Sequence, residues 1–132
     1  MPQGYESERR EFVRVKTSLS IRYKFLNQSG DDFDEKIYEG VTQNLSGGGL
    51  LLTGKIPDLG WIPDLLMQKI VIGVNIMLPD SPEPIKALTR VAWAEAFEEG
   101  SGKFAFGLMF REITKEAQDK IFRFIIKSKM PS

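Results

Sequence analysis

The amino-acid sequence predicts a mainly β protein, a six-stranded antiparallel β-barrel closed on itself and followed by a C-terminal helix. Three observations favour this class. Six short segments have the residue pattern of strands, glycine- or proline-rich turns lie between them, and helical periodicity appears only near the end of the chain. Closure is favoured because an open sheet of short strands leaves edges that pair with other chains.

The length of 132 residues predicts a single domain with one hydrophobic core. We expect the polar residues 1–8 to form a flexible N-terminal arm, and residues 9–132 to form the domain. From Val15 to Tyr23, apolar residues alternate with polar ones, which is the period-two pattern of a half-buried first strand. The polar, acidic residues 27–35 then predict a turn or loop.

Five further segments are expected to be strands, and they cover residues 37–42, 50–52, 69–78, 85–94 and 104–110. In the strand at 85–94, the residues predicted to share one face are Ile85, Ala87, Thr89, Val91 and Trp93. Residues 53–68 are expected to be irregular, because their prolines exclude a central strand, although Pro63 could begin a short helix. In this stretch Trp61, Leu65 and Leu66 either pack over a barrel end or form a surface for a partner.

The C-terminal helix is predicted over about residues 114–129. Thr114 is a suitable N-cap, and Glu116 suits the positive end of the helix dipole. The residues that follow helical spacing are Ile113, Ala117, Ile121, Phe124, Ile125 and Ser128. Phe122 and Ile126 lie partly off that face, so they either widen the buried stripe or remain free for a partner.

Composition excludes several classes of function. The chain has no cysteine and no histidine, which removes disulfides, thiolate nucleophiles and the usual general base near neutral pH. With no recognisable carboxylate constellation either, we expect no enzymatic activity, no metal and no cofactor. The net charge is zero, with 18 cations and 18 anions, and gives no argument for a nucleic-acid or membrane partner. The N-terminus is polar, so we expect that it is no signal peptide. No apolar run approaches the roughly 20 residues of a membrane span, so a cytoplasmic location is expected.

The first segment that could carry binding chemistry is rich in arginine. Arg10 and Arg14 form an R-x-x-x-R pattern, and Arg9 stands directly before it. Residues 8–24 carry six cations against two anions, a local net charge of +4 in a chain that is neutral overall. A guanidinium group can grip phosphate oxygens or the edge of guanine, and it can stack on a base. The alternative is that these arginines are solvated charges at a strand edge.

The second segment is the glycine-rich stretch at 44–50. Asn44, Ser46 and Gly49 form an N-x-S-x-x-G pattern, with Gly47 and Gly48 between the serine and the last glycine. Glycines allow positive φ and close approach of a ligand to the backbone, and their amides can face an anion. Asn44 can donate and accept, and Ser46 offers a hydroxyl. The alternative is an ordinary turn in which a side chain caps its own backbone.

Together and in this order, the two patterns resemble the PilZ domain family. Arg10-x-x-x-Arg14 matches that family's R-x-x-x-R, and Asn44-x-Ser46-x-x-Gly49 matches its [D/N]-x-S-x-x-G. Three strand segments extend the resemblance over roughly residues 9–125, and these are Gly49-Leu50-Leu51-Leu52, Arg90-Val91-Ala92-Trp93 and Phe106-Gly107-Leu108-Met109-Phe110. The resemblance implies a six-stranded PilZ-type barrel from a bacterium, with a C-terminal helix, that binds the second messenger cyclic di-GMP (c-di-GMP).

The resemblance also implies roles for single residues. Arg10 and Arg14 would hold guanine and phosphate, and the hairpin residues Asn44, Ser46, Gly47 and Gly49 would contact the other side of the ligand. Arg9, in front of the first motif, implies two stacked c-di-GMP molecules per site. Binding would order the arginine segment, and a protein effector would read the new surface.

Two rival interpretations stay open on the sequence alone. The first is a PilZ-fold adaptor for protein interactions with little or no nucleotide affinity. The second is a nucleic-acid-binding barrel that uses the cations from Arg9 to Lys24, and the neutral net charge and the acidic stretch Asp31–Glu35 weigh against it.

Overall fold

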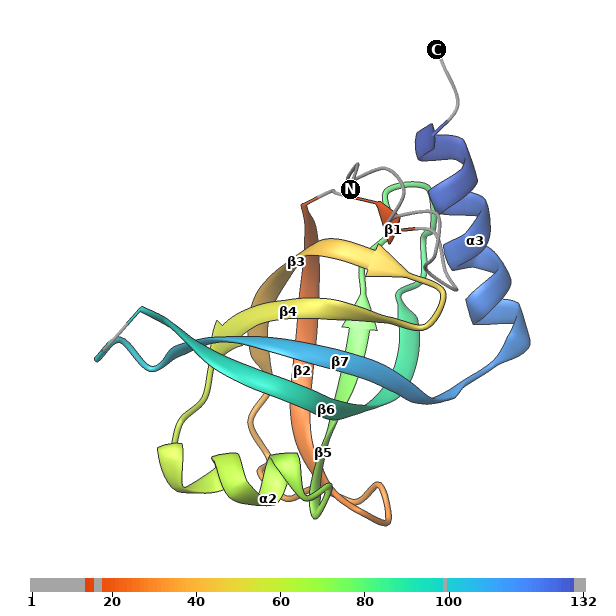
Figure 1. Ribbon diagram of the computed structural model, residues 1–132. Coiled ribbons are helices and arrows are strands. Elements are labelled where there is room, and N and C mark those ends of the chain that lie inside the picture. Colours follow the sequence, from red (N-terminus) through yellow and green to blue (C-terminus); the bar gives the residue numbers. More distant parts are fainter. Residues whose placement is uncertain (1–13, 16–17, 99, 130–132) are drawn as a thin grey trace, which may run out of the picture.

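The computed structural model describes residues 14–15, 18–98 and 100–129, with the backbone alone at positions 14, 15 and 98. Six antiparallel strands form a closed barrel (Figure 1). These are β2 (Leu19–Asn27), β3 (Tyr38–Ser46), β4 (Gly49–Lys55), β5 (Ile70–Ile76), β6 (Ile85–Glu98) and β7 (Lys103–Ile113). Their order around the barrel is β3-β2-β5-β6-β7-β4, and β4 pairs with β3 to close the ring. The predicted fold class is confirmed.

The strand boundaries differ from the prediction near the start of the chain. A two-residue strand, β1 (Arg14–Val15), pairs with the end of β3, and the long strand that follows, β2, begins only at Leu19. Strand β3 continues to Ser46, so most of the predicted polar motif lies on a strand. Residues 53–55, expected to be irregular, belong to β4, because they pair with the start of β7.

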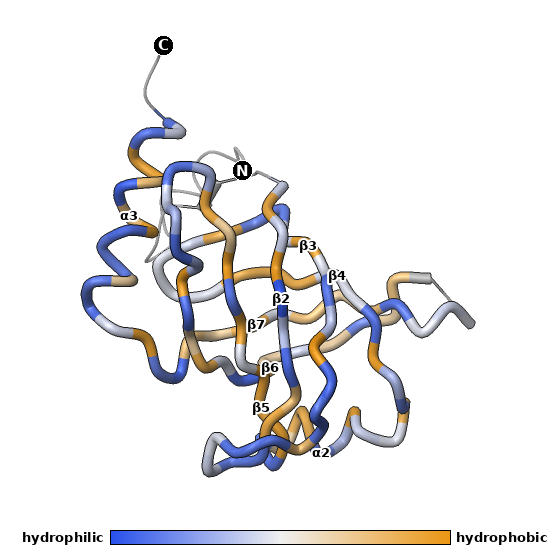
Figure 2. Tube along the Cα trace, turned by 180° about the vertical axis from the view of Figure 1, so that it is seen from behind, coloured by the Kyte–Doolittle hydropathy of each residue, from blue (hydrophilic) through white to orange (hydrophobic). Residues whose placement is uncertain are grey.

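The core follows from the alternation of side chains along the strands. On β2, Leu19, Ile21, Tyr23 and Phe25 are buried, while the residues between them face outward. Strand β5 is apolar almost throughout and is buried along its length, whereas the β2–β3 loop is hydrophilic (Figure 2). Each fully buried leucine or isoleucine side chain contributes about 1.5–3 kcal/mol to the stability of the fold. A slip of one residue would expose these side chains, so their burial fixes the register of the strands.

Two short helices, η1 (Leu59–Trp61) and α2 (Ile62–Leu66), cover one end of the barrel (Figure 1). Pro63 lies in the first turn of α2, as expected. Leu65 is fully buried, and the Trp61 ring meets Phe25 edge-on with 5.1 Å between ring centroids. These two residues therefore pack over the barrel end, whereas Leu66 is 45% exposed.

The predicted common face of residues 85–93 breaks at Trp93. Thr89 and Val91 are buried, but Trp93 is 46% exposed. Opposite β7, Val91 pairs with Leu108 and Trp93 pairs with the next residue, Gly107, so Ala92 is an extra residue in the ladder. This β-bulge turns the indole from the inner face to the outer face, which the simple alternation could not predict.

The C-terminal helix, α3 (Lys115–Lys129), lies beside the barrel near the end opposite α2 (Figure 1). The Thr114 hydroxyl accepts a hydrogen bond of 3.0 Å from the Ala117 amide, which is the predicted N-cap. Ile121 and Ile125 are buried against the core, whereas Ile126 is 60% exposed and does not widen the buried stripe. Among the helices of the described residues, none has both the length and the apolar character needed to cross a membrane.

Candidate functional site

The second predicted motif forms the hairpin that joins β3 to β4. Asn44 and Ser46 are the last residues of β3, Gly47 and Gly48 form the turn, and Gly49 begins β4. Leu45, between the two polar residues, is fully buried in the core. The motif is thus rigidly attached to the barrel.

The Ser46 hydroxyl holds the turn in shape. The side chain is only 3% exposed; its Oγ donates to the Gly49 carbonyl oxygen and accepts from the Gly48 amide, each over 3.2 Å. Because the hydroxyl has both partners inside the hairpin, its main role here is to position the turn. The sequence predicted a direct contact with a ligand for this residue, and the geometry favours an indirect one.

Asn44 differs in its hydrogen bonds. Its backbone is tied to Thr42, whose Oγ1 accepts from the Asn44 amide and donates to the Asn44 carbonyl oxygen. The side-chain oxygen Oδ1, however, is buried and has no hydrogen-bond partner among the described residues. Leaving such an atom unsatisfied costs about 1–3 kcal/mol, so a donor supplied by a ligand or by the arginine segment would be bound favourably here.

The glycines of the hairpin act differently from the prediction. In the described part of the chain, glycines with positive φ are found outside the hairpin, at Gly30, Gly100 and Gly102. The hairpin glycines therefore do not use the positive φ that glycine allows. Gly49 is needed for close packing instead, because a Cβ there would overlap the backbone carbonyl of Leu108 on β7.

The carbonyl groups of the turn accept hydrogen bonds from α3 and β7. Gly47 is buried, and its carbonyl oxygen accepts a 2.9 Å hydrogen bond from Gln118 Nε2 on α3. The Gly48 carbonyl oxygen accepts from the Phe110 amide over 3.0 Å. The Gly48 amide already donates to the Ser46 hydroxyl. Of the three glycine amides predicted to face an anion, only those of Gly47 and Gly49 are therefore left for that role.

The structure brings one end of the first motif to this hairpin. In the β1–β3 pairing, Arg14 lies opposite Ser46 and Val15 lies opposite Leu45. Paired strands are about 4.8 Å apart, so the backbone of Arg14 is next to the polar motif. Arg9, Arg10 and the side chain of Arg14 lie outside the described residues.

The register of the sheet extends the candidate site across the outer face of the barrel. Asn44 pairs with Leu51, Leu51 pairs with Gly107, and Gly107 pairs with Trp93. Leu51 and Gly107 face outward, because both neighbours of each along the strand are buried, and Trp93 is exposed on the same side after the bulge. Trp93 lies against Gly107, where an added Cβ would overlap the indole ring. The row therefore joins a polar amide to an exposed aromatic ring.

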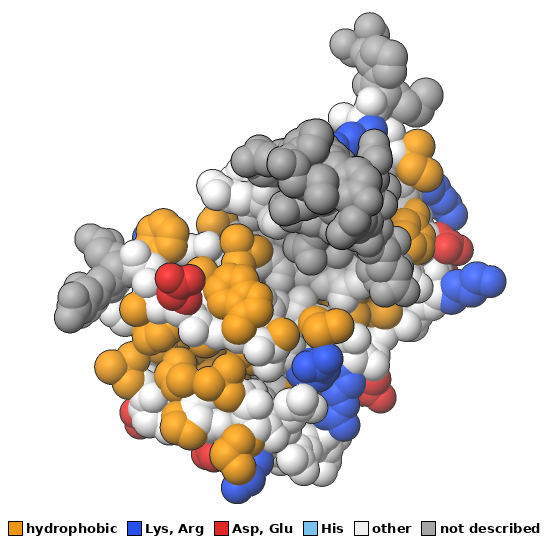
Figure 3. Space-filling view, viewed as in Figure 1, with side chains coloured by type: hydrophobic (Ala, Val, Ile, Leu, Met, Phe, Trp, Pro, Cys, Tyr) orange, Lys and Arg blue, Asp and Glu red, His pale blue; other side chains and the backbone are white. Residues whose placement is uncertain are grey.

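A second outward row lies beside the first. Gly49 pairs with Met109, and Met109 pairs with Arg90, whose Nη2 is 3.1 Å from the Met109 sulfur. Figure 3 shows hydrophobic side chains gathered on this face of β3, β4, β6 and β7. Sequence reasoning gave no role to Trp93, Arg90 or Met109. Outward alternation could have found Arg90 and Met109, but the bulge concealed Trp93.

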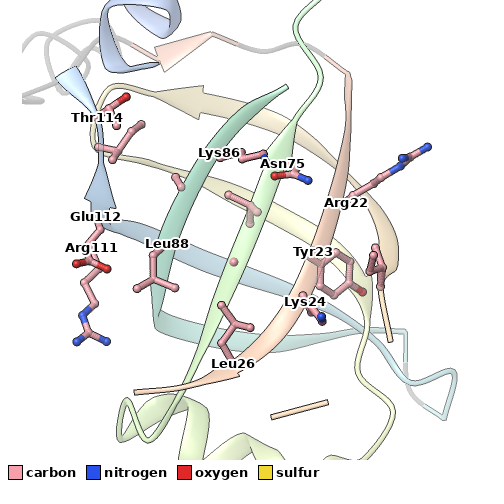
Figure 4. A pocket seen from close by; sticks show the side chains of 15 residues that line it. Arg22, Tyr23, Lys24, Leu26, Asn75, Lys86, Leu88, Arg111, Glu112 and Thr114 are labelled. Carbon is pink, nitrogen blue, oxygen red and sulfur yellow. The ribbon is translucent and has the colours of Figure 1, made fainter. Parts of the chain in front are cut away.

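Another hollow lies on a different side of the barrel. It measures about 780 Å³ and opens on the outer side of β2, β5 and β6 (Figure 4). None of the predicted site residues lines it. Two of its cations are already in ion pairs, Arg22 with Glu39 at 3.7 Å and Lys24 with Asp32 at 2.8 Å. We therefore keep the face that carries the β3–β4 hairpin as the candidate site.

Fold and site together define a class of small closed barrel with a C-terminal helix and a polar β3–β4 hairpin. The family model of the PilZ domain matches residues 8–127. The chain therefore belongs to the PilZ domain family, as its two motifs indicated.

Solved structures with the same fold are distant in sequence. The Bacillus subtilis inhibitor of motility MotI/DgrA has a TM-score of 0.65 and 18% identity, over 90% of this chain and 50% of that chain. The PilZ domain of YcgR from Escherichia coli with c-di-GMP has a TM-score of 0.59 and 12% identity, over 92% of each chain. MrkH of K. pneumonia in complex with c-di-GMP has a TM-score of 0.62 and 17% identity, over 90% of this chain and 51% of that chain.

These likenesses establish the fold alone, because the identities are low. The chain spans about half the length of MotI/DgrA and of MrkH. A comparison with curated proteins gives no match.

Proposed function

We propose that this PilZ domain binds c-di-GMP reversibly between its N-terminal arginine segment and the β3–β4 hairpin. The observation that carries the proposal is the pairing of β1 with β3, in which Arg14 lies opposite Ser46. Membership of the family and the c-di-GMP complexes of YcgR and MrkH support the choice of ligand. The chain keeps both sequence motifs that the resemblance associates with this ligand.

The chemistry of the ligand matches the residues available. The messenger carries two phosphates and two guanines, and Arg10 and Arg14 supply forked, permanently charged donors for phosphate oxygens and guanine edges. Asn44 offers a buried acceptor with no partner among the described residues, which suits a donor of a guanine or of an arginine. Ser46, Gly47 and Gly49 keep the hairpin in shape beneath the ligand.

Arg9 extends the proposal to stoichiometry. A third guanidinium directly before the first motif can contact a second guanine, and stacked bases add roughly 1–3 kcal/mol each. We therefore propose two stacked c-di-GMP molecules per site.

The proposed signal passes through the arginine segment. Ligand contact fixes this segment against the barrel, which costs conformational entropy and creates a surface that the unbound protein does not present. A protein effector then binds that surface. On this account, the domain binds and releases its ligand in the bacterial cytoplasm and does not convert it chemically. The division of the chain into an N-terminal arm, residues 1–8, and a domain, residues 9–132, stays a prediction.

Calorimetric titration of the full chain with c-di-GMP tests the proposal, with GTP and cyclic di-AMP as controls. We expect heat from c-di-GMP alone and a ratio of two ligands per chain. A ratio of one would exclude the stacked pair and leave the rest of the proposal standing. Absence of heat with c-di-GMP at micromolar concentrations would instead favour the adaptor with little nucleotide affinity.

A further inference from the structure

A smaller hollow lies between α3 and the turn that joins β5 to β6. It measures about 350 Å³ and includes no residue of either motif. Its apolar lining comes from Leu78, Pro82 and Phe124, and its cations are Lys120, Arg123 and Lys127. Leu78 is almost completely buried and Phe124 packs on the core, so the base of the hollow belongs to the rigid part of the fold.

The cations of this hollow share one side of α3. Positions 120, 123 and 127 follow helical spacing, which places them along a single stripe. Lys127 binds Asp80 over 3.0 Å, whereas Lys120 and Arg123 have no ion-pair partner among the described residues. Three cations and one anion line the hollow in a chain whose net charge is zero. Glu116, one turn before Lys120, does not line it.

The size and lining of the hollow select a kind of ligand. A volume of this size is near the lower limit of small-ligand sites, roughly 300 Å³, and accommodates one bulky side chain. The apolar base suits an aromatic or aliphatic group, and the unpaired cations at the rim suit carboxylates next to it. Anchors of this kind, an apolar side chain in a pocket with charges around it, carry most of the energy of many interfaces.

We propose that this hollow is a docking site for an acidic peptide segment of a partner protein, with a bulky apolar side chain inserted between α3 and the β5–β6 turn. Charge complementarity is the argument, since the unpaired groups at the rim are both cations. A membrane surface fits less well, because membrane binding uses protruding apolar side chains and a broad basic surface. This site is concave and carries Asp80 at its edge.

The test uses the ¹⁵N-labelled full chain without c-di-GMP, so it is independent of the proposed nucleotide binding. The probe is the blocked peptide DDFDE, and the control peptides are NNFNQ and DDADE. With millimolar DDFDE we expect amide shifts confined to residues 120–127 of α3 and the β5–β6 turn, and much smaller shifts with both controls. Equal shifts with NNFNQ, shifts elsewhere, or no shifts would overturn the proposal.

Charge reversal provides the second arm. The double variant Lys120→Glu/Arg123→Glu should weaken DDFDE binding by roughly tenfold or more, whereas Lys115→Glu, exposed on the same helix outside the hollow, should leave it unchanged. If the reversed protein does not fold, Lys120→Gln/Arg123→Gln replaces it. Equal weakening by the control variant would contradict the site. Sedimentation with phosphatidylglycerol vesicles, without a response to peptide, would assign the hollow to lipid instead.

Discussion

Gln118 on α3 donates a hydrogen bond from Nε2 to the Gly47 carbonyl oxygen, over a distance of 2.9 Å. The two residues are 71 positions apart in sequence, and the contact is partly buried. It therefore joins the C-terminal helix directly to the turn of the proposed ligand site. A change in the conformation of the turn on ligand binding would therefore alter this hydrogen bond and the first turns of α3.

Replacing Gln118 with alanine should loosen this connection. The Gly47 carbonyl would lose its side-chain donor, so we expect a loss of about 0.5–1.5 kcal/mol in the free energy of unfolding. Urea denaturation measures the loss, and hydrogen exchange should show faster exchange at the start of α3. Gln28→Ala, on an exposed residue of the β2–β3 loop, is the control and should change neither quantity.

Asn44 and Ser46 should respond in opposite ways to alanine substitution. Ser46→Ala removes two hydrogen bonds within the hairpin and should cost about 1–3 kcal/mol of stability. Asn44→Ala removes a buried oxygen without a described partner, so the free energy of unfolding should not fall, and should rise by up to about 1–3 kcal/mol, while c-di-GMP affinity falls. Calorimetry and urea denaturation of both variants separate the two roles. The assignment is wrong if Asn44→Ala keeps full affinity.

The arginines should dominate the affinity. We expect Arg10→Ala and Arg14→Ala each to weaken c-di-GMP binding by roughly tenfold or more, equal to about 1.4 kcal/mol, because each loses charged, forked hydrogen bonds. Ser46→Ala should cost less affinity than either. Arg22→Ala is the control, because Arg22 pairs with Glu39 and lines a hollow without motif residues. Wild-type affinity in both arginine variants would refute their assignment.

Trp93 and Gly107 should be energetically coupled. A Cβ at position 107 would overlap the indole, so Gly107→Ala should destabilise the protein by about 1–3 kcal/mol. In a Trp93→Ala background the overlap disappears, and the same substitution should cost much less. A double-mutant cycle in urea measures the coupling. An equal cost in both backgrounds would show that the indole does not occupy this position.

Tyr23 should make stability depend on alkaline pH. Burial raises the pKa of its hydroxyl from 10.0 to about 12. Because the folded pKa is above the unfolded one, the neutral form stabilises the fold below pH 10, and this contribution is lost as the pH rises through about 12. Tyr23→Phe leaves the Lys55 carbonyl without its donor, so it should cost about 0.5–1.5 kcal/mol at neutral pH.

Urea denaturation at increasing pH tests this expectation. The wild type should lose more stability than Tyr23→Phe between neutral pH and about pH 12. Tyr38, whose pKa is also raised to about 12 by burial and by its bond to Asp34, is present in both proteins, so the difference isolates Tyr23. Parallel pH profiles would contradict the prediction.

Patterns of side-chain alternation predicted much of the fold. The inward residues of β2 and the N-cap Thr114 follow directly from spacing and residue type. The bulge at Ala92 could not be predicted in this way, because apolar residues continue to alternate through Val91 and Trp93 in the sequence. Only the pairing with β7 reveals the extra residue. The longer course of β3 was hidden for a similar reason, since the polar Asn44 and Ser46 resembled a loop.

The sequence placed the two motifs of the candidate site, whereas the ligand contacts of the single residues stay predictions. The motif at 44–49 does meet the strand of Arg14, as the resemblance implied for the two motifs. The use of the Ser46 hydroxyl inside the hairpin, and the packing of Gly49 on Leu108, depend on contacts between distant strands. Such contacts have no local signature in the sequence.

Because the ring of strands is complete, each of the six barrel strands already has hydrogen-bonded neighbours on both sides. An extended peptide from another protein therefore finds, among the described barrel strands, no long free edge to join as an additional strand. Recognition must instead read side chains on the outside of the wall, and a substitution there can alter partner choice while the backbone ladder stays intact.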